Sequence, residues 1–193
     1  EIAKDGAFER TQTSCRATVS ADSAAQHVAQ AGRYHLYVSL ACPWAHRTLI
    51  ARALKGLQQV ISVDVVHPYL TDKGWSFDTD FDGTTGDTVG GRAYLQQVYL
   101  ESAPEYTGLI TVPVLWDKQL HMIVNNESAD ILRMMNSAFN AFSARPELDL
   151  YPEALRNEID AINDWIYPSI NNGVYRSGFA QSQRTYDKAV DEL

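Results

Sequence analysis

The sequence contains only two cysteines, Cys15 and Cys42, and no charged-then-apolar secretory pattern at its N-terminus, so we expect both thiols to be reduced. It lacks the roughly 18 consecutive apolar residues of a membrane span. It also lacks a run of lysine or arginine, and its formal net charge of -8 disfavours binding to nucleic acid. We therefore predict a cytoplasmic protein that binds neither membranes nor nucleic acids, and we predict no metal site.

The 193 residues are 45% apolar, which is enough to bury the core of one domain and part of a second. Hydrophobic periodicity between residues 34 and 136 predicts the element order β-α-β-α-β-β-α, which is typical of a thioredoxin-like α/β domain. The predicted strands are 34–40, 60–66, 111–116 and 120–124, and the predicted helices are 43–56, 92–102 and 127–135. Because the run at 60–66 is rich in β-branched residues and too apolar for an edge exposed on both faces, we expect it to be a buried parallel strand.

A polar, proline-containing stretch separates this domain from a second pattern, in which Leu155, Ile159, Ile162 and Ile166 recur at helical spacing. The predicted divisions are an N-terminal extension at 1–33, a thioredoxin-like domain at 34–136, a linker at 137–151 and the start of an all-α domain at 152–193. Because the sequence ends inside a helical pattern, we expect this last domain to be incomplete and the chain to be a fragment.

Cys42 stands between a predicted strand and a predicted helix, and Pro43 after it suits a first helical turn. Unpaired N–H groups and the helix dipole stabilise a thiolate at such a position, and His46 and Arg47 add positive charge unless they face solvent. The residue three positions after Cys42 is Ala45, so an external thiol, of which glutathione is the obvious one, must resolve a mixed disulfide. The alternative is a buried cysteine that only packs.

Two further motifs are suited to binding a ligand of this cysteine. Pro113 stands among β-branched residues and has no N–H donor, which predicts an edge position or a cis peptide after Val112. Glu127 and Ser128 open a predicted helix, where the carboxylate suits a ligand's ammonium, and the hydroxyl and the helix amides suit its carboxylate. The alternatives are an ordinary edge-strand proline and an ordinary helix cap.

The segment RYHLYVSLACPWAHR at 33–47 resembles the signature of the xi-class glutathione transferases, also called glutathionyl-hydroquinone reductases. Further stretches resemble that family in order and spacing over nearly the whole chain, at 74–77, 111–117, 123–128, 131–134 and 171–176. Two features depart from it. Cys15 stands where the family often has an aromatic residue, and the stretch 25–31 lacks the family's usual proline.

The resemblance implies glutathione as the cofactor and the reduction of glutathionyl-hydroquinones through a mixed disulfide on Cys42. It implies a thioredoxin-like domain followed by an all-α glutathione-transferase domain, and a homodimer when the protein is full length. Two other functions fit the same fold. One is an omega-like thiol transferase or dehydroascorbate reductase that uses the same cysteine, and the other is a non-catalytic module that binds aromatic ligands.

The resemblance also implies roles for residues outside the cysteine motif. Val112 would pair with the cysteinyl part of glutathione, while Trp75 and Arg92 would hold its glycyl end. Tyr167 and Tyr175 would line the aromatic pocket and donate a proton. The alternatives are a tryptophan that anchors a loop, a solvated arginine and tyrosines that only pack.

Overall fold

A computed structural model describes residues 2–193 of the chain. Its contacts form two compact units, a larger one of Thr13–Leu150 and a smaller one that joins Tyr151–Leu193 to the described residues before Thr13. The predicted extension at 1–33 therefore does not form a unit of its own, because its residues from Thr13 onward pack with the larger unit.

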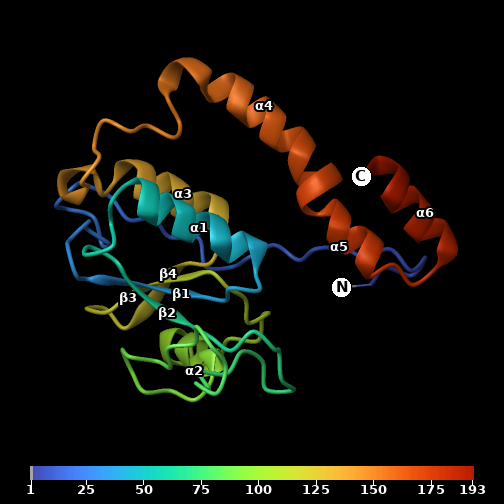
Figure 1. Cartoon of the computed structure of the whole chain (residues 1–193), viewed down its shortest axis with the longest axis horizontal. Helices are drawn as coiled ribbons and strands as arrows, with labels where there is room; N and C mark the ends of the chain where they lie inside the picture. Colours follow the sequence, from blue (N-terminus) through green and yellow to red (C-terminus); the bar gives the residue numbers. More distant parts are fainter. Residues whose placement is uncertain (1) are drawn as a thin grey trace. The chain divides into compact units, whose positions relative to one another are not determined.

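The larger unit is built on a four-stranded sheet with the order β2-β1-β3-β4 (Figure 1). The first two strands are parallel, and the other two neighbouring pairs are antiparallel. The strands are β1 (Tyr34–Val38), β2 (Ser62–Val65), β3 (Val114–Asp117) and β4 (Met122–Asn125). All five residues of β1 are buried, because this strand has a neighbour on each side and helices over its faces.

Three helices complete this unit: α1 (Pro43–Leu54), α2 (Leu95–Ser102) and α3 (Ser128–Ser137). The helices α1 and α3 pack together on one face of the sheet, and α2 lies on the other face (Figure 1). The predicted thioredoxin-like order β-α-β-α-β-β-α is confirmed. Helix α1 ends before Gly56, whose φ of +65° is unfavourable for residues with a side chain. Ala144 also lies so close to Gly56 that a Cβ atom there would clash with it.

Two elements differ from the sequence prediction. The predicted strand at 60–66 is parallel to β1 as expected, but it lies at the edge of the sheet. The loop residue Thr85 covers that edge, because its hydroxyl accepts the N–H of Val65 at 2.8 Å and its own N–H donates to the Val65 carbonyl at 3.2 Å. The strand predicted at 111–116 begins only at Val114, after the proline.

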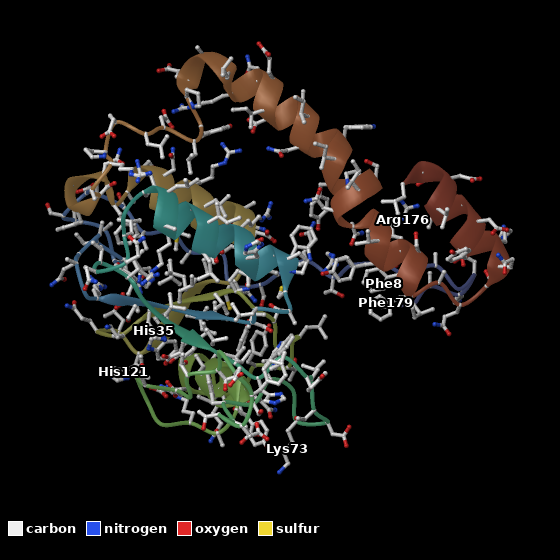
Figure 2. The ribbon with its side chains drawn as sticks, viewed as in Figure 1. Phe8, His35, Lys73, His121, Arg176 and Phe179 are labelled. Atoms are coloured by element: carbon white, nitrogen blue, oxygen red, sulfur yellow. The ribbon has the colours of Figure 1, made fainter. Side chains whose placement is uncertain are left out.

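The smaller unit is helical, as predicted for the C-terminal part of the chain. Its helices are α4 (Arg156–Ile166), α5 (Gly173–Gly178) and α6 (Gln183–Glu192), with a single π-helical turn at Tyr167–Asn171 between the first two. Residues near the N-terminus belong to it: Phe8 lies beside Phe179 with ring centroids 5.3 Å apart (Figure 2), and Arg10 Nε donates to Asn172 Oδ1 at 2.7 Å. Within residues 2–193, no helix has the length and apolar character needed to cross a bilayer.

A buried ionic cluster closes the turn between β3 and β4. Asp117 is fully buried, and it accepts hydrogen bonds from Arg33 Nε and His27 Nδ1, each at 2.9 Å, and from the N–H groups of Gln119 and Leu120. Burial by itself raises the pKa of Asp117, but these hydrogen bonds together outweigh it, so the pKa lies below its ordinary value.

Replacing Asp117 with Asn leaves the Arg33 guanidinium buried without its carboxylate, and we expect the free energy of unfolding at pH 7 to fall by about 3–5 kcal/mol. A carboxylate with a depressed folded-state pKa stabilises the fold above its unfolded pKa of about 3.9 and loses that contribution as pH falls. Chemical denaturation of both proteins should therefore show the difference narrowing below about pH 4. The exposed loop variant Asp72→Asn is the control, and a pH-independent difference for D117N would contradict this account.

Candidate active site

Cys42 lies at the junction between β1 and α1. It is the N-cap of α1, with extended backbone angles, its carbonyl accepts the N–H of His46 at 3.0 Å, and Pro43 occupies the first helical position. Its own N–H donates to the Ser39 carbonyl at 3.1 Å, which fixes the turn that leads out of the buried strand. The thiol is half-buried and lies where the first helical turn presents its amides and its positive dipole end. The predicted strand-to-helix position of Cys42 is therefore confirmed.

The structure brings Cys42 together with the Val112–Pro113 motif. The thiol Sγ lies 3.6 Å from the Val112 carbonyl oxygen, to which it donates, and Val112 is 6% exposed. The Val112–Pro113 peptide is cis, which is one of the two arrangements that Pro113 predicts. The predicted proximity of Cys42 to this motif is therefore present in the structure, and the pairing of Val112 with a ligand stays a prediction.

Glu127 and Ser128 lie at the N-terminus of α3. Glu127 is the N-cap, and its carboxylate accepts the N–H of Ala129 at 3.2 Å while its own N–H donates to Asn125 Oδ1 at 2.7 Å. The helix-capping alternative is thus present in the structure. A ligand role is compatible with it, since a carboxylate has about four lone-pair sites and capping occupies few of them; that role stays a prediction.

Arg47 joins α1 to this helix end, a contact that the sequence did not predict. Its Nε and Nη2 donate to Ser128 Oγ at 3.0 and 2.7 Å, and Nη2 lies 3.6 Å from Glu127 Oε1. The guanidinium carbon also lies 5.1 Å from the ring centroid of Trp44. Arg47 follows Trp44 by three residues and precedes the buried Ala51 by four, and this helical spacing was the available signal that it faces inward.

Buried polar groups connect the end of β4 to the segment before Val112. The side-chain Nδ2 of Asn126 donates to the Tyr99 hydroxyl at 3.1 Å, and that hydroxyl donates to the Thr111 carbonyl at 2.9 Å. The backbone N–H of Asn126 donates to the Cys15 carbonyl at 3.0 Å, and the Cys15 N–H donates to Asn126 Oδ1 at 3.3 Å. Cys15 is therefore held by its backbone, and burial raises the pKa of its thiol.

Trp75 and Arg92, the residues predicted to hold the glycyl end of glutathione, both lie in the long segment between β2 and α2. Trp75 is half-buried against the core, and its carbonyl accepts the first N–H of α2, from Leu95, at 2.9 Å. The Arg92 guanidinium binds Asp87 at 2.7 Å and Glu101 at 2.6 Å. A ligand carboxylate would have to share Arg92 with these two, so its ligand role stays a prediction.

Tyr167 and Tyr175 lie in the smaller unit. Tyr167 begins the π-helical turn. Tyr175 lies against Phe8 and Phe179, with centroid distances of 6.4 and 6.3 Å, and the Arg10 guanidinium carbon lies 4.3 Å from its ring centroid. These contacts favour packing as at least one role of Tyr175.

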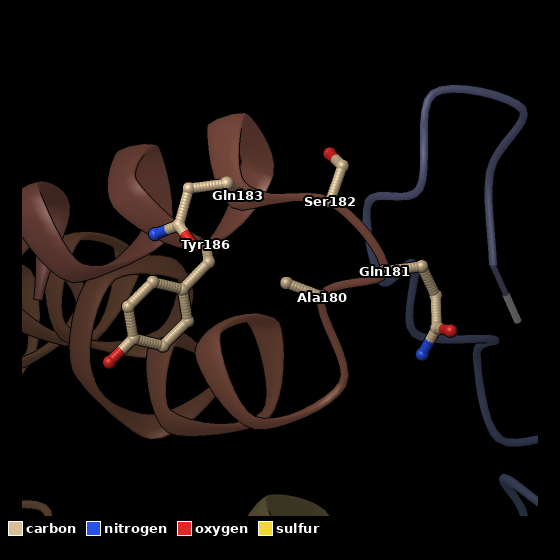
Figure 3. A pocket seen from close by; sticks show the side chains of 5 residues that line it. All are labelled: Ala180, Gln181, Ser182, Gln183 and Tyr186. Carbon is tan, nitrogen blue, oxygen red and sulfur yellow. The ribbon is translucent and has the colours of Figure 1, made fainter.

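The smaller unit also contains a surface depression of about 360 Å³ (Figure 3). Its lining is Ala180, Gln181, Ser182, Gln183 and Tyr186. None of the predicted site residues is in this lining, and we assign it no ligand. Across residues 2–193, no group of three or more His, Cys, Asp or Glu side chains is arranged to hold a metal ion.

Comparison with known proteins gives a family match over the larger unit. The model of the glutathione S-transferase N-terminal domain matches residues 41–138. The glutathionyl-hydroquinone reductase YqjG of Escherichia coli is 53% identical over 194 residues, covering 97% of this chain and 59% of that protein. The chain thus spans about three fifths of the length of this curated relative.

Solved structures agree with this match. The xi glutathione S-transferase of Phanerochaete chrysosporium superposes with a TM-score of 0.96 at 47% identity, covering all of this chain and 62% of that one. The glutathione-bound structure of E. coli YqjG gives a TM-score of 0.88 at 51% identity, covering 97% of this chain and 61% of that one.

The two cysteines are predicted to differ in reactivity. Both thiols are half-buried, but burial raises the pKa of Cys15, whereas Cys42 lies at a helix N-terminus. We expect iodoacetamide at pH 7 to modify Cys42 at least about tenfold faster than Cys15, because thiolates are the reacting form. Mass spectrometry of digested protein over time measures both rates. Cys15→Ser should keep the fast modification and Cys42→Ser should remove it; equal rates, or faster modification of Cys15, would refute the difference.

Proposed function

This chain belongs to the xi class of the glutathione transferase family, and on that basis we propose that it binds glutathione and reduces glutathionyl-hydroquinones to hydroquinones. The observation that carries the proposal is the Cys42 thiol at the N-terminus of α1, 3.6 Å from the Val112 carbonyl. The relative named a glutathionyl-hydroquinone reductase and the relative with bound glutathione support the substrate and the cofactor.

In the proposed complex, glutathione lies along the edge formed by Val112 and the N-terminus of α3. The backbone of Val112 pairs with the cysteinyl residue, Glu127 accepts the ligand's ammonium, and Ser128 with the first amides of α3 holds the γ-glutamyl α-carboxylate. Trp75 and Arg92 hold the glycyl end. The contact between Cys42 and Val112 supports this register, because it brings the ligand sulfur next to the protein sulfur.

The proposed reaction begins when the Cys42 thiolate attacks the glutathione sulfur of the conjugate. The carbon–sulfur bond breaks, and its electron pair stays on the aromatic carbon, which takes a proton from Tyr167, Tyr175 or water and leaves as the hydroquinone. A second glutathione thiolate then attacks the glutathione sulfur of the Cys42 mixed disulfide. The net change is one conjugate and one glutathione to one hydroquinone and one glutathione disulfide.

For the full-length protein we further propose a cytoplasmic homodimer. The sparse cysteines, which we expect to be reduced, are consistent with this location. The homodimer rests on the family resemblance.

Cys42→Ser tests the proposed function directly. We expect this variant to lose turnover of a glutathionyl-hydroquinone by about a thousandfold or more, because it removes the nucleophile itself. Glutathione binding should persist, since the contacts of Val112, Glu127 and Ser128 do not use the sulfur. Intact-mass spectrometry of the wild-type chain, after incubation with the conjugate, should detect one glutathione on Cys42, and Cys15→Ser is the matched control.

Other outcomes separate the alternative functions. A wild-type protein that reduces dehydroascorbate or small mixed disulfides but leaves the conjugate intact would replace the proposal with an omega-like thiol transferase. A protein whose ligand binding is unchanged in Cys42→Ser and which has no turnover with either substrate class would be a non-catalytic binding module.

A further inference from the structure

Two guanidinium N–H groups of Arg47 converge on a single oxygen. Nε and Nη2 donate to Ser128 Oγ at 3.0 and 2.7 Å, both within ordinary hydrogen-bond length. Ser128 as a whole residue is 3% exposed, so its side chain bonds mainly to groups of the protein in the absence of a ligand. This arrangement makes Arg47 the principal partner of the Ser128 side chain.

The two Arg47 contacts determine which hydrogen bonds the Ser128 hydroxyl accepts and which one it can donate. A serine hydroxyl offers one donor and two acceptor lone pairs, and the two Arg47 contacts account for both acceptor positions. The remaining O–H points to Glu127 Oε1 at 3.5 Å, which is the long limit of a hydrogen bond. A ligand carboxylate can take over this weakly used donor, whereas a ligand ammonium finds no acceptor on Ser128.

Charge balance at the same place also depends on Arg47. The carboxylate of Glu127 would repel a second carboxylate beside it, yet Arg47 Nη2 lies 3.6 Å from Glu127 Oε1 and offsets that charge. The other oxygen, Oε2, accepts the Thr13 hydroxyl at 3.4 Å. The side chains of Arg47 and Glu127 are 31% and 23% exposed, so solvent screens the pair only in part.

The position of Arg47 is itself held by packing. Its guanidinium carbon lies 5.1 Å from the Trp44 ring centroid, and α1 and α3 are in direct contact. Because Cys42 caps the same helix that carries Arg47, one rigid element supplies both the proposed sulfur nucleophile and the support of Ser128.

We propose that Arg47 is a positioning residue that makes Ser128 a dedicated donor to a carboxylate and thereby sets the preference of this subsite for the γ-glutamyl α-carboxylate of glutathione. The inference rests on the proposed glutathione site. It adds that carboxylate recognition is controlled from α1, by a residue that acts on the ligand through Ser128.

Calorimetric titration with two ligands tests the inference. One is glutathione, and the other is the analogue in which the γ-glutamyl α-carboxylate is a carboxamide. The wild-type chain should prefer glutathione by about tenfold or more, as expected for a hydrogen bond to a charged group. Arg47→Gln should lose most of that preference, and Arg47→Lys should keep part of it, because an ammonium retains the charge and one donor.

Matched controls separate positioning from a loss of stability. Arg52 is on the same helix, and its guanidinium donates to the backbone carbonyls of Ile61 at 2.7 Å and Gln58 at 2.9 Å. Arg52→Gln should lower thermal stability and leave the ratio of the two dissociation constants unchanged. Ser128→Ala should lose the preference by itself, and adding Arg47→Gln to it should change the ratio little further.

The outcomes are distinct from those of the proposed function. An Arg47→Gln chain that keeps the wild-type preference, or one that weakens both ligands equally, would overturn the inference while glutathione binding by the wild type stands. Arg47→Lys provides the comparison if the glutamine variant folds poorly. A wild-type chain that binds neither ligand would overturn the glutathione site and this inference together.

Discussion

The antiparallel register between β1 and β3 is the constraint on which the candidate site depends. Tyr37 pairs with Val114, so the residues that follow β1 lie beside those that precede β3. Cys42 and Val112, 70 positions apart, meet for that reason. A slip of one residue would exchange the faces of the strand, and the complete burial of β1 opposes such a slip because it would force a new packing of the core.

Packing of α1 against α3 supplies the second half of the site. The first helix carries the cysteine and Arg47, and the second begins with Glu127 and Ser128. Two helix N-termini on one face of the sheet make this region electropositive at the backbone level. Arg47 contacts both Ser128 and Glu127 at the N-terminus of α3. In the proposed site, Glu127 accepts hydrogen bonds from the ligand's ammonium, and Ser128 donates one to the ligand's carboxylate.

Local signals predicted most of the fold and the central residue of the site. Pro43 and the strand before it predicted the helix that Cys42 caps, and Pro113 predicted a special peptide. Partners distant in sequence set what these signals missed. Arg47 forms hydrogen bonds to Ser128, a residue 81 positions away. Strand β2 lies at the edge of the sheet because it pairs only with β1, and no local pattern predicts that. Likewise, the ion pairs of Arg92 with Asp87 and Glu101 depend on how the loop between β2 and α2 folds back.

The proposed reaction uses an external thiol, and both cysteines together account for that choice. Resolution of a disulfide on Cys42 within the chain would need a second thiolate, and Cys15 is the sole other cysteine. Burial raises the pKa of its thiol and so disfavours the thiolate, and its backbone is fixed to Asn126 by two hydrogen bonds. A free glutathione thiol has neither restriction, because it diffuses and ionises in water. The proposed monothiol cycle therefore depends on where Cys15 is held as well as on the alanine at position 45.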